Sequence, residues 1–298
     1  MNKITRIAII TKDEHICAKY LVARLSTLNN VEILVINYNS KKVSGVSFCK
    51  RLLLKRGLIV CIDNFLRLAL NNVVSKNQGA DIPNFGSNPI CFDKYWSSTY
   101  TNEWKLYQNN ITIKSVTEVN SGDGLKIIRD NNPHIILLAG APIVSDSVIK
   151  MAEYGILNAH QGITPDYAGN SPTIWSIYNN CKYDIGYTIH YVVPQVDSGP
   201  IIEQMRLPWC PDWSWNTIND YTGKIMYTRL ASIVENWIMT ETRPIGRIQR
   251  VKTTKPPAGY FVKLIAERNK MRLSKQLSHF IIPPEWSSES EKITNIIL

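Results

Sequence analysis

Apolar runs and polar segments alternate along the chain in a way that predicts strands and helices in turn. The runs from Arg6 to Ile10 and from Val31 to Asn37 have the continuity of buried strands, and the segment from about His15 to Leu25 between them has helical spacing. The runs from Ile111 to Val116 and from His134 to Ala139 repeat the strand pattern. Strands that alternate with helices favour a parallel sheet covered on both faces.

The second half of the chain continues this alternation. We expect a strand over Gly155 to Leu157, a helix over Pro172 to Asn179 and a β-branched strand over Ile185 to Val193. Apolar residues at near-helical spacing predict a long packing helix over Thr217 to Met239. The predicted fold class is therefore α/β, a Rossmann-like, mostly parallel twisted sheet with helices on both faces and a small C-terminal appendage.

Polar residues mark the expected helix starts between these strands. Asn120 and Ser121 are placed to cap a helix over Asp123 to Asp130, which Pro133 stops.

Two segments fall outside the simple alternation. Residues 41–78 carry apolar positions near helical spacing with basic residues between them, which predicts an amphipathic basic helical insertion. Such an insertion can dock on its own domain or on a dimer partner, or it can adsorb to an anionic membrane surface. We predict a catalytic domain over residues 1–240 and a small appendage over residues 241–298. A homodimer remains open.

Composition favours a cytoplasmic enzyme. The chain has 298 residues, 44% of them hydrophobic, but no apolar run long enough to span a bilayer, and its N-terminus lacks a secretory pattern. Its six cysteines show no Cys-x-x-Cys spacing, which favours reduced thiols and no metal site. A formal net charge of +10 suits an anionic partner such as a nucleotide or an acidic membrane surface. We predict no DNA partner.

Three polar residues stand at strand ends or turns, where open α/β sheets bind their ligands. Asn158 and His160 are two apart on a strand and share a face, and Asp197 follows in a Pro-Gln-Val-Asp-Ser-Gly-Pro turn. The amide can donate to a developing oxyanion, the imidazole can exchange a proton, and the carboxylate can orient and stabilise the imidazole. No nucleophilic Ser or Cys accompanies them, so the pattern predicts direct attack of an external nucleophile on a carbonyl. A core Asn, a core His and a turn Asp remain the alternative.

The stretch around these residues resembles the 10-formyltetrahydrofolate-dependent formyltransferases. In that family an Asn-x-His pair and a downstream Asp form the catalytic triad, here Asn158, His160 and Asp197. The matching segments are Asn158-Ala159-His160, Pro165-Asp166-Tyr167-Ala168-Gly169, Trp175 to Asn179, Thr188-Ile189-His190, and Asp197 to Ile202.

The resemblance also implies where the two substrates bind. His190 receives a structural or supporting role beside the triad. The implied contacts of the donor, 10-formyltetrahydrofolate, are Leu138, Ala141, Pro142, Ile143, Val144, Gln195 and Val196. The implied contacts of the acceptor are Lys12, Gln161, Gly162 and Thr164.

Variations within these motifs favour a particular acceptor. The first βα loop has no Gly between Met1 and Asn30, whereas the purine-pathway relatives hold a phosphate with a Gly-containing loop there. Gly162, Thr164 and Ala168 stand where methionyl-tRNA formyltransferases usually carry Ser, Leu and Arg. The pattern is similar to sugar-nucleotide N-formyltransferases, which implies a nucleotide-linked amino sugar destined for surface polysaccharide such as O-antigen. Methionyl-tRNA formylation, folate hydrolysis by water and a catalytically idle binding protein remain as alternatives.

Overall fold

The computed structural model describes residues 4–12, 15–39, 94–97, 111–251, 253–276 and 280–289. The predicted insertion at residues 41–78 lies outside these ranges. Short 3-10 helices in the described part are η2 (Lys94–Trp96) and η4 (Pro284–Glu289).

The centre of the molecule is a seven-stranded sheet with the order β3-β2-β1-β4-β5-β6-β7. The first five strands in this order pair in parallel, and β6 and β7 add antiparallel pairs, which confirms the predicted mostly parallel sheet. The last strand, β7, was not predicted, because it is only half buried and carries Glu203, Gln204 and Arg206. The strands are β1 (Thr5–Lys12), β2 (Val31–Tyr38), β3 (Ile111–Val116), β4 (Ile135–Ala139), β5 (Ile156–His160), β6 (Gly186–Tyr191) and β7 (Ile201–Arg206).

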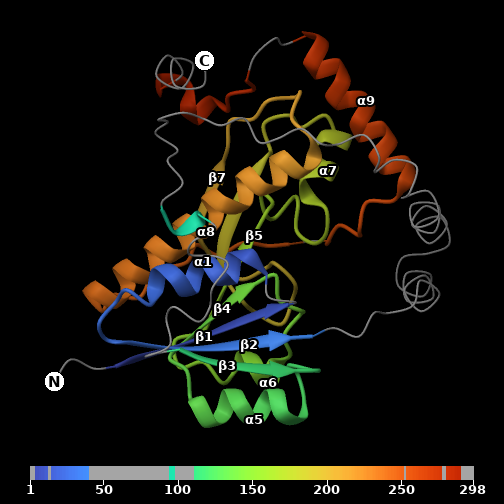
Figure 1. Cartoon of the computed structure of the whole chain (residues 1–298). Coiled ribbons are helices and arrows are strands. Elements are labelled where there is room, and N and C mark those ends of the chain that lie inside the picture. Colours follow the sequence, from blue (N-terminus) through green and yellow to red (C-terminus); the bar gives the residue numbers. More distant parts are fainter. Residues whose placement is uncertain are drawn as a thin grey trace.

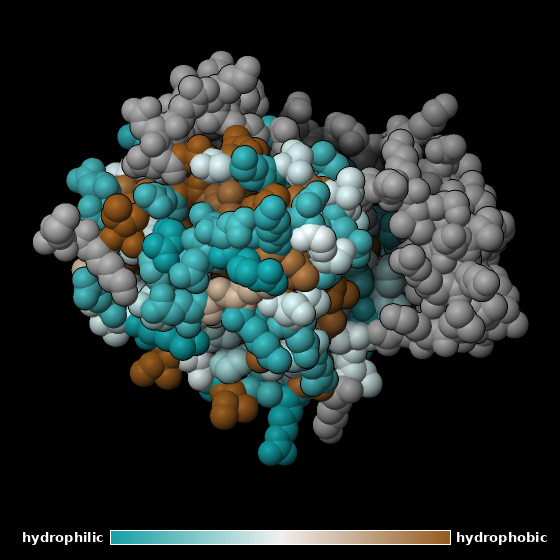
Figure 2. Space-filling model, turned by 90° about the horizontal axis from the view of Figure 1, so that it is seen from below, coloured by the Kyte–Doolittle hydropathy of each residue, from teal (hydrophilic) through white to brown (hydrophobic). Residues whose placement is uncertain are grey.

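Helices cover both faces of the sheet, as predicted (Figure 1). One face packs against α1 (Ile16–Leu25), α7 (Pro172–Tyr178) and α8 (Trp215–Thr240), and α9 (Tyr260–Gln276) packs on α7. The other face packs against α5 (Gly122–Asn131) and α6 (Asp146–Ile149). Seen from below, the described surface is mostly hydrophilic, with hydrophobic residues singly or in small groups (Figure 2). Within the described ranges no helix is both long and apolar enough to cross a membrane.

The two polar residues before α5 do not cap this helix through their side chains, contrary to the prediction. Ser121 occupies the N-cap position, but its side chain makes no capping hydrogen bond. Asn120 instead bridges to the loop after β4: its Nδ2 donates to Ile143 O at 2.9 Å, and its Oδ1 accepts from Ser145 N at 2.7 Å. The side chain predicted as a cap therefore fixes the loop that was assigned to folate.

A partly buried guanidinium joins α1 to α8. Arg24 forms a two-pronged pair with Glu235, with both N–O distances 2.7 Å, and also donates to Tyr20 Oη at 2.8 Å and Ser232 Oγ at 2.9 Å. Bidentate guanidinium–carboxylate pairs fix orientation as well as distance. This contact sets α8 against α1, and both helices border the site described below.

Residues after 240 return to the catalytic sheet. Arg247 pairs with Ile201 at the start of β7, and Lys255 forms a bridge with Gly169. The division at residue 240 stays a prediction, but the segment that follows it contacts the loops that carry the predicted site.

Replacing Arg24 by Met should lower the free energy of unfolding by roughly 3 kcal/mol, because the Glu235 carboxylate would be left without its partner in a largely buried place. Chemical denaturation of the parent and the variant measures this difference.

Arg129→Met provides the matched control, because Arg129 is exposed on α5. The double variant Arg24→Met/Glu235→Met should recover part of the loss. Equal stabilities of the parent and the Arg24→Met variant would contradict a role of this pair in joining the two helices.

Candidate active site

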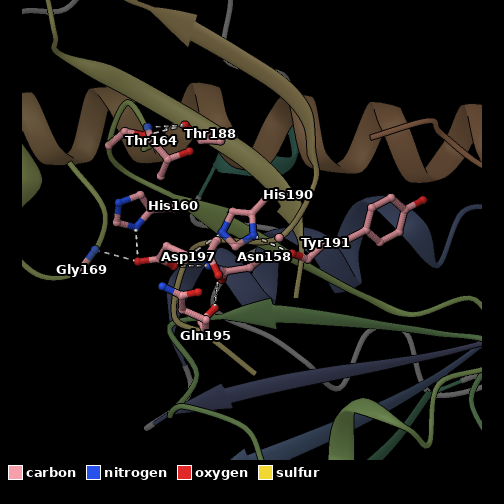
Figure 3. A network of polar contacts seen from close by, with 12 residues as sticks. Asn158, His160, Thr164, Gly169, Thr188, His190, Tyr191, Gln195 and Asp197 are labelled. Carbon is pink, nitrogen blue, oxygen red and sulfur yellow. Dashed lines mark hydrogen bonds and ion pairs between the residues drawn. The ribbon is translucent and has the colours of Figure 1, made fainter. Parts of the chain in front are cut away.

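The predicted catalytic residues meet at one edge of the sheet. Asn158 and His160 lie on β5, where they pair directly with His190 and Thr188 of the antiparallel strand β6. Asp197 lies in the turn between β6 and β7 and points back toward both β5 residues (Figure 3). The sequence spacing of two along β5 therefore places the amide and the imidazole beside the same carboxylate.

The Asp197 carboxylate is the centre of the contacts. Its Oδ2 accepts from Gly169 N at 2.8 Å and lies 3.4 Å from His160 Nδ1. Its Oδ1 lies 3.3 Å from Asn158 Nδ2 and 3.5 Å from His190 Nε2. Burial by itself raises the pKa of Asp197, but the imidazoles of His190 and His160, which are positive when protonated, and the Gly169 N–H together outweigh it and leave the pKa lowered. The carboxylate is therefore ionised at neutral pH.

His160 is held as a neutral imidazole with a defined tautomer. Its Nε2 donates to Tyr167 O at 2.8 Å, so Nδ1, which faces Asp197, carries the lone pair. Burial lowers the pKa of His160 below its ordinary value, and the neighbouring Asp197 only partly opposes this. A neutral Nδ1 beside an ionised carboxylate can accept a proton, and the carboxylate stabilises the imidazolium that results.

Asn158 and His190 orient one another. His190 Nδ1 donates to Tyr191 O at 2.8 Å, so in the neutral ring Nε2 accepts from Asn158 Nδ2 at 3.2 Å. This contact, with the one to Asp197, fixes which end of the Asn158 amide faces the carboxylate. The supporting role expected for His190 matches this geometry.

Two predicted acceptor contacts have other positions. A Cβ on Gly162 would lie 2.6 Å from His160 Nε2 and 2.6 Å from Tyr167 O, so the glycine makes room for the hydrogen bond between them. Thr164 is buried, and its backbone N–H donates to Thr188 Oγ1 at 3.2 Å. The resemblance implied substrate contacts for both residues. In the structure neither lines the cavities beside the triad, and both shape the loop after β5.

The other two predicted acceptor contacts, Gln161 and Lys12, differ in whether they line a cavity. Gln161 lines a large cavity beside the triad and contacts Asn219 O through Nε2. Lys12 is exposed at the end of β1 and is absent from the lining of that cavity.

Two cavities adjoin the triad and both reach Asn158. The smaller one, about 140 Å³, brings together the triad residues Asn158 and Asp197 with His190 and most of the predicted folate contacts. Gln195 is the exception, because its Nε2 donates to Val251 O at 3.0 Å. The predicted folate residues that line it are Leu138, Ala141, Pro142, Ile143, Val144 and Val196.

The larger cavity, about 580 Å³, lies on the other side of Asn158. The residues that line it include His160 and several polar and aromatic side chains that sequence reasoning missed. These residues were not predicted, because the apolar spacing of α8 indicates only a packing helix, although Gly223 interrupts that spacing. The missed lining residues are His15, Trp96, Asn170, Asn219, Asp220, Gly223, Lys224 and Tyr227.

The fold and the site define an α/β enzyme with an Asn-His-Asp constellation between two cavities. Residues 109–233, which contain all three catalytic candidates, match the family described as Formyl transferase. The segment that carries the site is therefore similar to the formyl transferases.

Similarity to individual proteins agrees with this family. The chain is 26% identical over 190 residues to a methionyl-tRNA formyltransferase of Akkermansia muciniphila, over 63% of this chain and 54% of that protein. The chain thus spans about half the length of this curated relative.

Solved structures share the fold at low sequence identity. A sugar N-formyltransferase of a Shewanella species has a TM-score of 0.52 and 13% identity, and covers 89% of this chain and 87% of its own. A 4-N formyltransferase of Francisella tularensis has a TM-score of 0.52 and 11% identity, with 90% and 88% covered. A phosphoribosylglycinamide formyltransferase of Anaplasma phagocytophilum has a TM-score of 0.50 and 15% identity, with 85% and 96% covered.

Asp197→Asn should lower kcat about a hundredfold or more, because the carboxylate that stabilises the His160 imidazolium is lost. The pKa of His160 should fall further without this negative charge. In the parent, kcat/KM should hold through neutral pH and decline only below pH 6.5, as His160 becomes protonated. In the variant this acid limb should move to lower pH. The pH profile of kcat/KM measures both effects.

Asp184→Asn is the matched control, since Asp184 pairs with Arg206 at 2.8 Å and lines neither cavity. A folded Asp197→Asn protein with a parental rate would remove Asp197 from the mechanism.

Proposed function

We propose that this protein transfers the formyl group of 10-formyltetrahydrofolate to the primary amine of a nucleotide-linked amino sugar, for the synthesis of a surface polysaccharide. The observation that carries this proposal is the pair of cavities that meet at Asn158, one largely apolar in its walls and one rich in polar side chains. A transfer between two substrates needs two binding places that converge on the reacting atoms.

The smaller cavity suits the donor. Its walls at Leu138, Val144 and Val192 are aliphatic and suit a flat heteroaromatic ring such as a pterin. Ile143 beside it is 71% exposed, so an apolar surface is open for a ligand to cover. When bound, the donor supplies an electrophilic formyl carbon whose oxygen becomes negative as an amine adds to it.

The protein's own groups handle the charge and the proton. The Nδ2 contacts of Asn158, 3.2 and 3.3 Å, lie at the long end of the hydrogen-bond range, so a developing oxyanion can compete for one of these N–H groups. His160 Nδ1 takes the proton of the attacking amine, and Asp197 stabilises the resulting imidazolium. The proton then held at Nδ1 is available to the departing nitrogen.

The larger cavity suits an amino sugar. Side-chain amides, a carboxylate and an ammonium line it, and these groups can pair with sugar hydroxyls as donors and acceptors. The indole of Trp96 adds a flat apolar wall and is held by stacking on Tyr20 at 3.9 Å. A sugar N-formyltransferase is among the solved structures that share the fold, which favours the same acceptor class.

Methionyl-tRNA formylation is the second candidate function. The curated relative carries that name, and the net charge of +10 would favour a nucleic-acid acceptor.

Incubation with 10-formyltetrahydrofolate and a panel of amino-sugar nucleotides should give one or more products with the mass gain of a formyl group. Competition by charged initiator tRNA, with a steep salt dependence of the rate, would favour the second candidate. Release of formate without any amine would indicate a hydrolase. If no panel member gains mass while methionyl-tRNA does, the amino-sugar proposal is wrong.

Variants on the two sides of Asn158 should separate donor binding from acceptor binding. Gly223→Leu places a side chain in the larger cavity, where even a Cβ would lie 3.2 Å from Gln161 Nε2, so KM for the acceptor should rise about tenfold or more. Ile143→Ser removes apolar surface beside the smaller cavity, so a non-reactive folate analogue should bind severalfold more weakly.

Each variant is the control for the other. Kinetics with varied acceptor and calorimetric titration of the folate analogue measure the two effects. If both variants change the same parameter, the assignment of separate donor and acceptor cavities is wrong.

A further inference from the structure

A segment that follows the residues matched to the formyl transferase family runs along the loops that carry the site. This strap comprises the described residues 247–251 and 253–256. Arg247 exchanges two backbone hydrogen bonds with Ile201, 2.7 and 2.8 Å, just after the Asp197 turn. Lys255 N donates to Ala168 O at 2.7 Å, beside the Gly169 N–H that binds Asp197. The strap thus touches both loops that meet at the catalytic carboxylate.

Between these two attachments, Gln249 contacts the Asp197 turn itself. Its Nε2 donates to Asp197 O at 3.1 Å and to Gly199 O at 2.8 Å. The opposite amide orientation would set Oε1 against two carbonyl oxygens, so the acceptors fix the orientation. Its own Oε1 is buried without a hydrogen-bond partner among the described atoms. The side chain thus forgoes one hydrogen bond while it supplies two donors to the turn.

The turn depends on such support. Asp197 has φ of 50°, a left-handed conformation that an L side chain rarely adopts. Gly199 follows in close contact with the preceding strand, since a Cβ there would lie 1.8 Å from Tyr191 O. Strained backbone persists where its surroundings hold it, and the two carbonyls on either side of Ser198 are held by one amide.

We propose that Gln249 is a positioning residue for the reaction, acting through Asp197. By fixing the carbonyls of Asp197 and Gly199, it aims the Asp197 carboxylate at His160 Nδ1. The expected effect on turnover rests on the proposed function, whereas the expected effect on the pKa of His160 does not. Among the residues that the structure describes, the titratable groups that face His160 are Asp197 at Nδ1 and His190 beyond it.

Gln249→Met tests this role. The thioether has a similar length and no N–H, and it also removes the unpartnered Oε1, so the stability should change little. A less well aimed Asp197 carboxylate should lower kcat at least about tenfold, with KM for the donor unchanged. The pKa of His160 should fall, because the carboxylate raises it in the parent. Nuclear magnetic resonance titration of histidine-labelled protein measures that pKa without any turnover.

Trp175→Phe is the matched control. Trp175 Nε1 donates to Pro256 O at 2.8 Å, so this change removes one hydrogen bond to the same strap without touching the Asp197 turn. The control should keep the parental kcat and the parental His160 titration.

The outcomes separate this inference from the proposed function. If no acceptor is formylated but the His160 titration shifts in Gln249→Met and not in Trp175→Phe, the positioning role holds and the proposed reaction is wrong. An unshifted titration in folded Gln249→Met protein overturns the positioning role. If Gln249→Met does not fold, Gln249→Asn, which keeps the amide but shortens its reach, carries the same measurement. Loss of fold in both variants would make Gln249 a requirement of folding and would also overturn the inference.

Discussion

The buried carboxylate of Asp197 is the group on which the site depends. A charge removed from water is costly unless donors and opposite charges replace its hydration. Here the backbone N–H of Gly169 and the amide of Asn158 donate to the carboxylate, and the imidazoles of His160 and His190 lie 3.4 and 3.5 Å from it, where they carry an opposite charge when protonated. Because these groups lie on two strands and a separate loop, the burial of the carboxylate is compensated only when all three elements are in place.

This requirement explains the departure from an all-parallel sheet. The antiparallel strand β6 sets His190 directly opposite Asn158, and the turn that leads to β7 returns Asp197 to the same edge. A parallel crossover would have placed a helix at this point in the chain. The antiparallel hairpin of β6 and β7 instead places both His190 and Asp197 beside Asn158.

The same arrangement separates the two cavities. Loop residues after β4 border the smaller cavity, and residues of α8 border the larger one, with Asn158 shared between them. Two contacts away from the triad hold the cavity walls in place. The Arg24–Glu235 pair holds α8 beside the larger cavity, and the bridge from Asn120 holds the 143–145 loop beside the smaller one. The geometry of the site is thus maintained by contacts between elements far apart in sequence.

Local patterns in the sequence determined the α/β class and the order of the strands and helices other than β7, because apolar periodicity is a property of short segments. The spacing of Asn158 and His160, together with the resemblance of the stretch around them, indicated the candidate triad. Several features depended on tertiary structure: the neutral tautomer of His160, the loop-shaping role of Gly162, the cavity lined by α8 and the contact of Gln249 with Asp197. Each of these joins residues that are distant in the chain or depends on burial. A single sequence carries no signal for which distant backbone carbonyl a glutamine will meet, whereas the folded chain fixes that partner through packing.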